Sequence, residues 1–364
     1  MENLKVLHVI NGLWPGGAQI MLLRLCEEFL RHGVESEVFS LTKNDTIKPQ
    51  LEALGVKCHQ GNLLALRQHV LKSSPDVTQG WMYHSDLAIS IATMFSKHSK
   101  NIFWSVHHSI DDISKEKFTS RVVIRFLKLI SKQPRNTVYV SRISKQQHEA
   151  LGYSTSNSVL IPNGYDLELF KKDASLRARF RNEFGIPDDQ FVVGNLARFH
   201  IMKDHEAFLD AAALFSSKHS NCGFIIAGRG TDNEQITGWI EEKGLSGKVH
   251  VLDDRRDVSA ILNGIDILAT SSRFGEAFPM VIGEAMSCET ICCATDVGDI
   301  AWLIGEDDLI SPPGDAAALC ENWWKVANLN PEANGELAKK LRERIKANFS
   351  LSVVAKKYLA LYSK

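Results

Sequence analysis

Short apolar segments alternate with amphipathic segments along most of this chain, and this alternation limits the folds it can adopt. Residues 6–10 form the first apolar segment, and after a break at Gly16-Gly17 residues 19–32 repeat apolar side chains at helical spacing. Continuous apolar runs of this kind are typical of parallel strands covered by helices on both faces. The pattern predicts an α/β fold with parallel sheets.

The same alternation restarts in the second half, where residues 191–196 read as a strand and 204–215 as a helix. A chain of 364 residues also exceeds the usual size of one hydrophobic core. Two Rossmann-like domains therefore fit better than one long sheet. Further strands are predicted at 36–41, 77–81, 102–106, 137–140, 159–162, 223–227, 249–252, 265–269 and 290–294, with a further helix at 232–243.

The turn cluster Pro162-Asn163-Gly164 marks the end of the first domain, because such residues are typical of turns and linkers. Residues 166–189 are charged and carry few strand signals, and the chain end is helical in period with a break near 348–350. We therefore predict domains at 1–165 and 166–345, with a final helical segment, 346–364, that packs back on the first domain.

Composition excludes several classes of protein. The apolar share of 44% and charged share of 23% are those of a globular protein. No stretch approaches the ~20 apolar residues that span a bilayer, and the first residues lack the pattern of a signal peptide. The expected location is therefore the cytoplasm.

The seven cysteines include no Cys-x-x-Cys pair, which favours buried thiols over a disulfide or metal framework.

Charge is divided unevenly between the two halves. Residues 1–164 hold 19 basic and 13 acidic side chains, whereas the remainder holds 23 and 30. This asymmetry suggests that different partners meet different domains, and the acidic second half argues against a nucleic-acid partner.

The most informative segment is 271–286, Ser-Ser-Arg-Phe-Gly-Glu-Ala-Phe-Pro-Met-Val-Ile-Gly-Glu-Ala-Met, which follows an apolar strand. Pro279 suits the first turn of a new helix, and a helix start offers free N–H groups and partial positive charge to a phosphate. Glu276 would lie before this helix and Glu284 inside it, where carboxylates could accept hydrogen bonds from sugar hydroxyls. Taken alone, two glutamates near a helix start are more often solvated residues or residues favoured by the helix dipole.

Two further segments follow predicted strands. Arg198 and Lys203 come after the strand at 191–196 and could neutralise a diphosphate, although this spacing alone also fits surface charge. Gly228 closes the next strand, where a small residue lets a backbone approach a ligand. All three segments fall at strand ends of one predicted parallel sheet, where ligands bind.

Taken together, these segments resemble the family-4 retaining glycosyltransferases of GT-B fold, also known as glycosyl transferases group 1. The resemblance covers nearly the whole chain in order. It rests on Gly16-Gly17-Ala18-Gln19, Ile161-Pro162-Asn163-Gly164-Tyr165-Asp166 with Phe170, Arg198 with Lys203, Gly228-x-Gly230, Glu276 with Glu284, and Thr295-Asp296-Val297-Gly298.

The resemblance implies a fold, a reaction and site residues. Two Rossmann-like domains would face each other across a cleft, the first binding the acceptor and the second a nucleotide sugar, with a UDP-sugar favoured over a GDP-sugar. Such an enzyme would belong to polysaccharide or lipopolysaccharide biosynthesis. The implied catalytic residues are His107, Glu276, Arg198 and Lys203. The implied donor-binding residues are Gly16, Gly17, Arg198, Lys203, Gly228, Asp254, Arg255, Glu276, Ala277, Phe278, Pro279, Met280, Val281 and Glu284.

Individual roles follow from the same resemblance. Arg198 and Lys203 would hold the diphosphate, Glu284 the ribose and Glu276 the transferred sugar, while the base would lie near 254–256. Register favours His107 over His108 as the histidine near the sugar.

The chain departs from the family pattern at two places. Asp299 and Trp302 stand where the family often has glycine and glutamate, which puts phosphate contacts from that loop in doubt. Asp204 stands where many members have glycine, a change tolerated because aspartate caps a helix well.

We expect a reaction that needs neither metal nor cofactor, because no Asp-x-Asp pair follows a strand. Retention without an obvious nucleophile fits a front-face displacement.

The acceptor side carries one more prediction. Residues 120–135 place basic side chains at helical spacing among apolar ones, with no acidic residue. Such a helix could lie on an anionic membrane leaflet or could be a core helix with a solvated basic face.

The rival functions are a sugar-nucleotide epimerase or phosphorylase on the same fold and a non-catalytic nucleotide-sugar-binding protein.

Overall fold

The computed structural model describes residues 4–110 and 112–363, with the backbone alone for Lys115. The chain divides into two compact units, one running up to Gly164 and resuming at Leu351, the other running from Tyr165 to Ser350. The predicted domain boundaries fall at 165/166 and 345/346, whereas the two units divide at 164/165 and 350/351. The later second boundary coincides with the start of the last helix.

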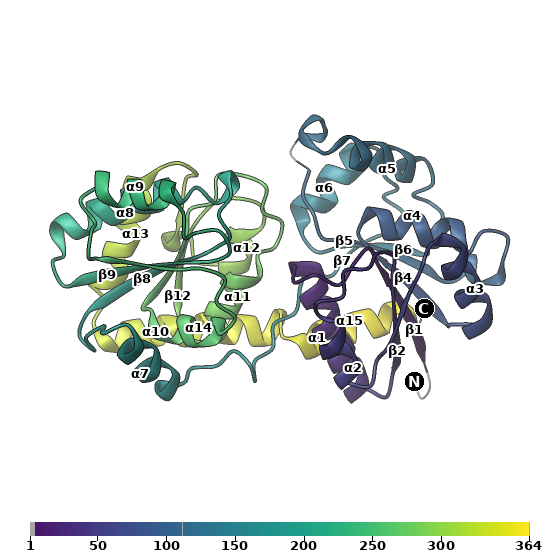
Figure 1. Ribbon diagram of the computed structural model, residues 1–364, viewed down its shortest axis with the longest axis horizontal. Coiled ribbons are helices and arrows are strands. Elements are labelled where there is room, and N and C mark those ends of the chain that lie inside the picture. The colour runs from purple at the N-terminus through teal and green to yellow at the C-terminus, as the bar shows by residue number, and fades with distance from the viewer. Residues whose placement is uncertain (1–3, 111, 364) are drawn as a thin grey trace. The chain divides into compact units, whose positions relative to one another are not determined.

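Unit 1 is built on one parallel sheet with the strand order β3-β2-β1-β4-β5-β6-β7. The strands are β1 (Lys5–Ile10), β2 (Glu35–Ser40), β3 (Lys57–Gln60), β4 (Val77–Trp81), β5 (Ile102–Val106), β6 (Asn136–Tyr139) and β7 (Ser158–Leu160). One face carries α1 (Gly17–Arg31), α2 (Lys48–Ala53) and α15 (Leu351–Tyr362) (Figure 1). The other carries α3 (Leu63–Ser73), α4 (Tyr83–Ala92), α5 (Phe118–Leu129) and α6 (Arg142–Ala150), with 3₁₀ turns η1 (Lys97–Asn101) and η2 (Ile113–Lys115) in the same stretch of chain.

Each face of this sheet has its own hydrophobic core. Leu25 and Phe29 of α1 pack with Tyr358 of α15 on one side, and Leu66 of α3 packs with Trp104 of β5 on the other. Because both faces are covered, the central strands β4 and β5 are buried along their whole length, including the polar residues of β4.

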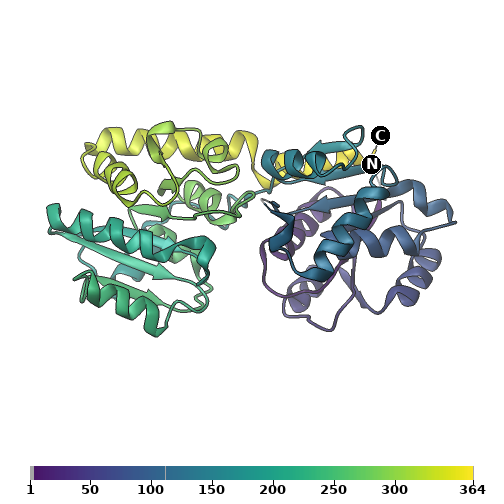
Figure 2. The ribbon, with the colours of Figure 1, turned by 90° about the horizontal axis from the view of Figure 1, so that it is seen from above.

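Unit 2 repeats this construction with the parallel strand order β10-β9-β8-β11-β12-β13. The strands are β8 (Phe191–Leu196), β9 (Cys222–Ala227), β10 (Val249–Leu252), β11 (Ile267–Thr270), β12 (Ile291–Thr295) and β13 (Ile310–Ser311). The helices are α7 (Ala174–Glu183), α8 (His205–Lys218), α9 (Glu234–Glu242), α10 (Val258–Gly264), α11 (Met280–Ser287), α12 (Ile300–Ile304), α13 (Ala316–Ala327) and α14 (Pro331–Asn348), with η3 (Ile201–Lys203) and η4 (Asp307–Leu309). Figure 1 shows α8, α9 and α13 above the strands of unit 2, and α4 and α5 above the strands of unit 1. Figure 2 shows the same chain from above, with these helices toward the viewer.

The first strand of each sheet lies inside the sheet. In unit 2 the chain builds outward from β8 to β10 in one direction and then from β11 to β13 in the other. The order reverses between β8 and β11, and in unit 1 between β1 and β4. Ligands of open α/β sheets bind at the carboxyl ends of the strands beside such a switch point.

The structure differs from the sequence predictions at several places. The strands β3 and β13 were missed because β3 is a polar edge strand and β13 has only two residues. The basic helix predicted over 120–135 is α5, which ends at Leu129. Pro134 disfavours helical geometry in the residue before it, and Ser131 Oγ donates to Lys128 O at 2.8 Å where the helix ends. Pro279 lies one residue before α11 instead of in its first turn.

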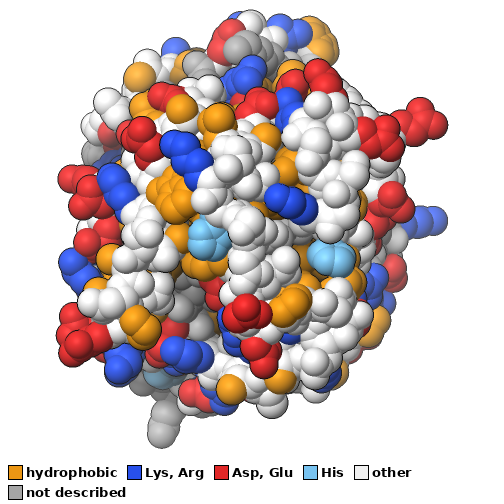
Figure 3. Space-filling view, turned by 90° about the vertical axis from the view of Figure 1, so that its left-hand side faces the viewer, with side chains coloured by type: hydrophobic (Ala, Val, Ile, Leu, Met, Phe, Trp, Pro, Cys, Tyr) orange, Lys and Arg blue, Asp and Glu red, His pale blue; other side chains and the backbone are white. Residues whose placement is uncertain are grey.

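The helices, cysteines and surface charges can be compared with what the composition predicts. Among the described residues, no helix is both long enough and apolar enough to span a bilayer. All seven cysteines are free thiols, and six of them are buried. On the face of unit 2 drawn in Figure 3, acidic and basic side chains are interspersed and no continuous basic stripe is seen.

Candidate active site

The candidate site lies at the switch point of unit 2, where the loops that follow β8 and β11 meet. These strands are neighbours, with Val193 paired to Ile267 and Gly194 to Leu268. The loop after β8 carries Lys203, and the loop after β11 carries Glu276. A small hollow opens between the two loops, and Lys203, Ser272 and Glu276 are among the residues that line it.

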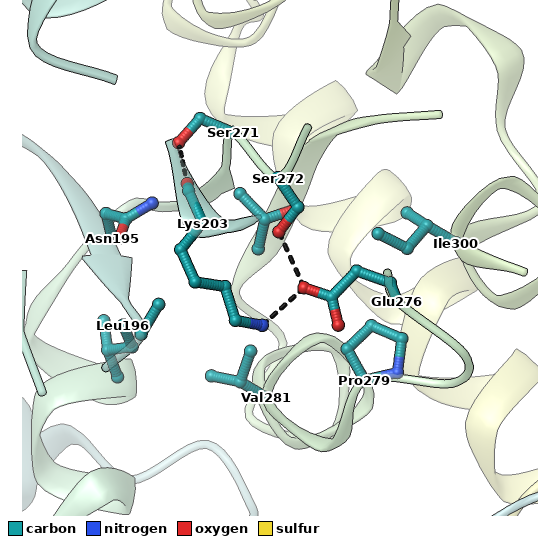
Figure 4. Close-up of a pocket in the computed structure, with 11 residues that line it drawn as sticks. Asn195, Leu196, Lys203, Ser271, Ser272, Glu276, Pro279, Val281 and Ile300 are labelled. Atoms are coloured by element: carbon teal, nitrogen blue, oxygen red, sulfur yellow. Dashed lines mark hydrogen bonds and ion pairs between the residues drawn. The ribbon is translucent and has the colours of Figure 1, made fainter. Parts of the chain in front are cut away.

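Lys203 and Glu276, predicted from separate motifs, contact each other. The Lys203 ammonium forms an ion pair with Glu276 Oε1, and Ser272 Oγ donates to the same oxygen at 2.6 Å (Figure 4). Their side chains are only 20% and 10% exposed, so the pair is shielded from screening by water. The arrangement sets a cation and a hydrogen-bond acceptor side by side, as an anionic ligand bearing hydroxyls would require.

Side chains of the loop after β11 tie it to the loop after β8. Ser271 Oγ donates to the carbonyls of both Lys203 and Asp204, each at 2.9 Å, and Arg273 Nε donates to Asp204 Oδ2 at 2.8 Å. Asp204 has φ +48°, a left-handed conformation that explains why glycine would serve equally well at this position. These bonds hold Lys203 in place without restraining its side chain.

Arg198 lies in the loop that follows β8, where it is exposed. Within the described residues its guanidinium makes no hydrogen bond or ion pair. An exposed guanidinium on the same loop as Lys203 is suited to binding an anion.

Gly228 serves a contact within the protein itself. A Cβ at this position would lie 2.2 Å from the carbonyl oxygen of Ala197, and φ is +148°. The glycine therefore allows the loop after β9 to approach the loop after β8. The predicted approach of Gly228 to a ligand stays a prediction.

The start of α11 is positioned by the linker. Tyr165 is fully buried, its hydroxyl donates to Pro279 O at 3.2 Å, and its ring occupies the space above Gly283. The first N–H groups of α11, at Met280 and Val281, have no acceptor within the helix. Phe278 is buried before the helix and Glu284, also buried, is its fifth residue.

The loop at 295–298 supports Glu276 from behind. A Cβ on Gly298 would lie 2.2 Å from Glu276 O, and Asp299 N donates to Ala277 O at 3.2 Å. Thr295 Oγ1 donates to Ser272 O at 2.6 Å. The residues Thr295 and Gly298, which match the family pattern, therefore position the backbone that carries the Glu276 carboxylate.

Gly298→Ala is expected to lower kcat/KM by up to about 100-fold, because the new methyl group must displace the Glu276 backbone. Gly314→Ala is the matched control, since Gly314 also has positive φ (+78°) but a Cβ added there would meet no atom within 4 Å. Both variants should lose the ~1–2 kcal/mol that a left-handed non-glycine residue costs. Steady-state kinetics and thermal unfolding of both separate the two effects; equal activity in both would contradict this role of Gly298.

The predicted base-binding residues lie in the loop after β10. Asp254 is exposed with φ +31°. Arg255 is held by the carboxylates of Glu183 and Asp257, whose hydrogen bonds raise the pKa of the guanidinium. Arg255 is thus an anchor of this loop.

In unit 1 the predicted residues gather near the β1/β4 switch point. Gly16 precedes α1 and Gly17 begins it; a side chain at Gly17 would meet open space, whereas one at Gly16 would meet Gln19. His107 follows β5, stacks on Trp81 with ring centroids 5.0 Å apart, and has Nε2 2.8 Å from Ser105 Oγ. Burial lowers the pKa of His107 to about 3, so its imidazole is neutral. His108, by contrast, pairs with Glu116 at 2.8 Å.

Several site residues received no role from the sequence. Ser271 and Ser272 orient Lys203 and Glu276, and Asn195 donates to Ala269 O at 3.0 Å while its buried Oδ1 has no hydrogen bond within the described chain. The sequence could have indicated these three residues, because each is a small polar residue at the end of a mainly apolar parallel strand.

Two Rossmann-like units are the architecture of the GT-B fold, and unit 2 carries this charged pair at its switch point. Two family models match the chain: Glycosyltransferase Family 4 over residues 15–169 and Glycosyl transferases group 1 over residues 177–348. The chain belongs to this family, and the resemblance read from the sequence is confirmed.

Known proteins of similar sequence and fold agree with this placement. The putative glycosyltransferase EpsF of Bacillus subtilis (strain 168) is 22% identical, covering 80% of this chain and 79% of its own. The phosphatidyl-myo-inositol mannosyltransferase of Mycobacterium leprae (strain TN) is 25% identical, covering 84% and 82%. The crystal structure of Anabaena Alr3699/HepE in complex with UDP has the same fold, with a TM-score of 0.87 at 19% identity over 99% of this chain and 100% of that one.

Proposed function

We propose that this glycosyltransferase transfers a sugar, with retention of anomeric configuration, from a nucleotide diphosphate sugar to a glycan or a lipid-linked glycan. The observation that carries the proposal is the contact of Lys203, Glu276 and Ser272 at the β8/β11 switch point, on the same loops as the Arg198 cation. A diphosphate needs cationic partners and a sugar needs hydrogen-bond acceptors. This site offers both within one hollow.

Each residue has a distinct part in the proposed reaction. Arg198 and Lys203 neutralise the diphosphate as it leaves, Glu276 holds hydroxyls of the transferred sugar, and Glu284 holds the ribose. The departing phosphate oxygen accepts the proton of the acceptor hydroxyl on the same face, so no protein nucleophile is needed. Catalysis then rests on charges that are already oriented before the reaction begins.

A UDP-sugar is the favoured donor. The Anabaena protein of the same fold has been solved with UDP and with UDP-glucose, which supports a uridine donor here. The reaction is proposed to be independent of divalent metal, since two cationic side chains are available for the leaving group. Polysaccharide or lipopolysaccharide synthesis is the proposed setting.

A panel of nucleotides and nucleotide sugars tests the proposal, with thermal shift for binding and nucleotide release for turnover. UDP and one UDP-sugar should stabilise the protein, and UDP release should require a saccharide acceptor and persist in EDTA. Nuclear magnetic resonance of the product gives its anomeric configuration. Release or epimerisation without acceptor would indicate an epimerase or hydrolase, and binding without any turnover would indicate a non-catalytic protein.

We further propose that α5 rests on an anionic membrane surface, where a lipid-linked acceptor would be found. Phe118 and Leu129 at its ends are 72% and 77% exposed, and Val122 and Phe126 are 51% and 47% exposed. The helix has basic but no acidic residues. Exposed apolar side chains beside basic ones are typical of helices that lie in a membrane interface. The relative from Mycobacterium leprae, which bears the name phosphatidyl-myo-inositol mannosyltransferase, supports a lipid surface.

Vesicle sedimentation tests this placement. Wild-type protein should sediment with phosphatidylcholine vesicles that contain phosphatidylglycerol, and less so as salt rises. Phe118→Ser with Leu129→Ser should abolish sedimentation, whereas Leu169→Ser, at a residue of unit 2 that is 54% exposed, should not. Absence of wild-type binding at every salt concentration would contradict the proposal.

A further inference from the structure

Two histidines and a glutamate meet near the edge of the sheet of unit 1, on elements other than β1 and β4. Glu37 comes from β2, His59 from the edge strand β3 and His69 from α3. His69 Nε2 lies 2.8 Å and His59 Nε2 3.6 Å from the same oxygen, Glu37 Oε2. The two imidazole rings have centroids 4.1 Å apart.

The fold, and not sequence proximity, brings these residues together. In the parallel pairing of β2 and β3, Phe39 lies opposite His59 and Glu37 opposite Lys57. Alternate residues of a strand share a face, so Glu37 and His59 point to the same side of the sheet. The helix α3 covers that side, with Leu66 and Val70 in the core below it, and it presents His69 to the other two residues.

We propose that Glu37, His59 and His69 form a binding site for a divalent transition-metal ion, with zinc the best match. Two imidazole nitrogens and one carboxylate oxygen are a zinc ligand set, with bonds of about 2.0–2.2 Å in a tetrahedron. Such bonds place ligand atoms about 3.3 Å apart. One ligand atom from each of the three residues falls within 4.8 Å of the others, so small side-chain rotations complete the geometry.

The two oxygens of the Glu37 carboxylate have different partners. His69 Nε2 lies 2.8 Å from Oε2, within the cluster. Lys5 Nζ lies 3.0 Å from Oε1, the other carboxylate oxygen, and so leaves Oε2 to the site.

One ligand atom lacks a hydrogen bond. The Nε2 atom of His59 is buried and has no hydrogen-bond partner among the residues that the structure describes. An unsatisfied buried polar atom is costly, and coordination of a metal would satisfy it. A bound ion would join the edge strand β3 to β2 and α3. Cys58, adjacent in sequence, packs on the opposite face and is outside the site.

Zinc binding to the whole protein tests the inference, which is independent of the transfer reaction. After treatment with a chelator, the protein should bind one equivalent of zinc by calorimetry, and its Tm should rise with zinc concentration. Bound cobalt(II) should show the visible absorption of a tetrahedral site. His59→Gln and His69→Gln should each weaken zinc binding by at least about tenfold, the loss that even outer-shell changes cause at metal sites.

His32→Gln is the control, because His32 lies 3.5 Å from Glu28 on α1 in a similar pair outside the cluster. Circular dichroism shows that each variant is folded before titration. The inference is overturned if wild-type protein binds no zinc at submillimolar concentration, or if both cluster variants bind it as the wild type does. In that case the three residues form a hydrogen-bonded cluster only.

Discussion

Lys203→Ala is expected to lower kcat by about 10²–10³-fold, the loss of about 2.7–4 kcal/mol that follows removal of one donor to a developing negative charge. KM for the donor should change much less, because the ammonium interacts most strongly with the diphosphate as the glycosidic bond breaks. In the free protein Lys203 is paired with Glu276. Glu276 keeps Ser272 as a partner after the substitution, so the fold of the site should survive.

Lys243→Ala is the matched control for this experiment. Lys243 also forms an ion pair within unit 2, with Asp210. It is the residue directly after α9, away from the switch-point loops. Its loss should leave kcat unchanged. Initial rates of nucleotide release over a range of donor concentrations give kcat and KM for both variants. Near-normal turnover by Lys203→Ala would exclude the proposed role of the ammonium.

Arg181→Ala is expected to destabilise unit 2 by about 3–5 kcal/mol, the cost of removing one partner from a buried ion pair. The Arg181 side chain is fully buried and donates to Asp266 Oδ2 at 2.8 Å. It also donates to the carbonyls of Gly264, Pro187, Asp188 and Gln190. Asp266 Oδ2 accepts from Val192 N as well, at 2.8 Å, so this cluster joins the beginnings of β8 and β11.

Arg177→Ala tests whether burial is the cause. Arg177 pairs with the other oxygen of Asp266 at the same distance, 2.8 Å, but its side chain is 35% exposed. Water can replace an exposed partner, so this variant should lose about 1 kcal/mol or less. Because the chain has two units and need not unfold in one step, hydrogen exchange of peptides from 165–350 is the appropriate measurement. Equal protection in the two variants would contradict the explanation.

Much of the fold could be predicted because strands in parallel sheets have a local signature. The ranges 77–81, 102–106, 191–196 and 249–252 coincide with β4, β5, β8 and β10. These strands needed no long-range information, since most of their residues are apolar and turn residues or helices follow them. The polar strand β3 lacks that signature, because it lies at the edge and buries little.

The site was predicted in parts. Motif order placed Lys203 and Glu276 in strand-end loops, and adjacent strands in a parallel sheet bring such loops together. Their direct contact, and the serines that hold it, depend on the β8/β11 pairing and on side-chain packing. The cluster of Glu37, His59 and His69 had no local pattern at all, because its members come from three different elements.

The sequence by itself determined the class of this protein: repeated apolar segments require parallel sheets, and ordered motifs identify the glycosyltransferase family. Tertiary structure alone decided which side chains act on one another. Lys203 and Glu276 are 73 residues apart, and Glu37 and His69 are 32 apart. Periodicity reports only neighbours along the chain, whereas an ion pair or a metal site depends on distances that strand order and helix packing set.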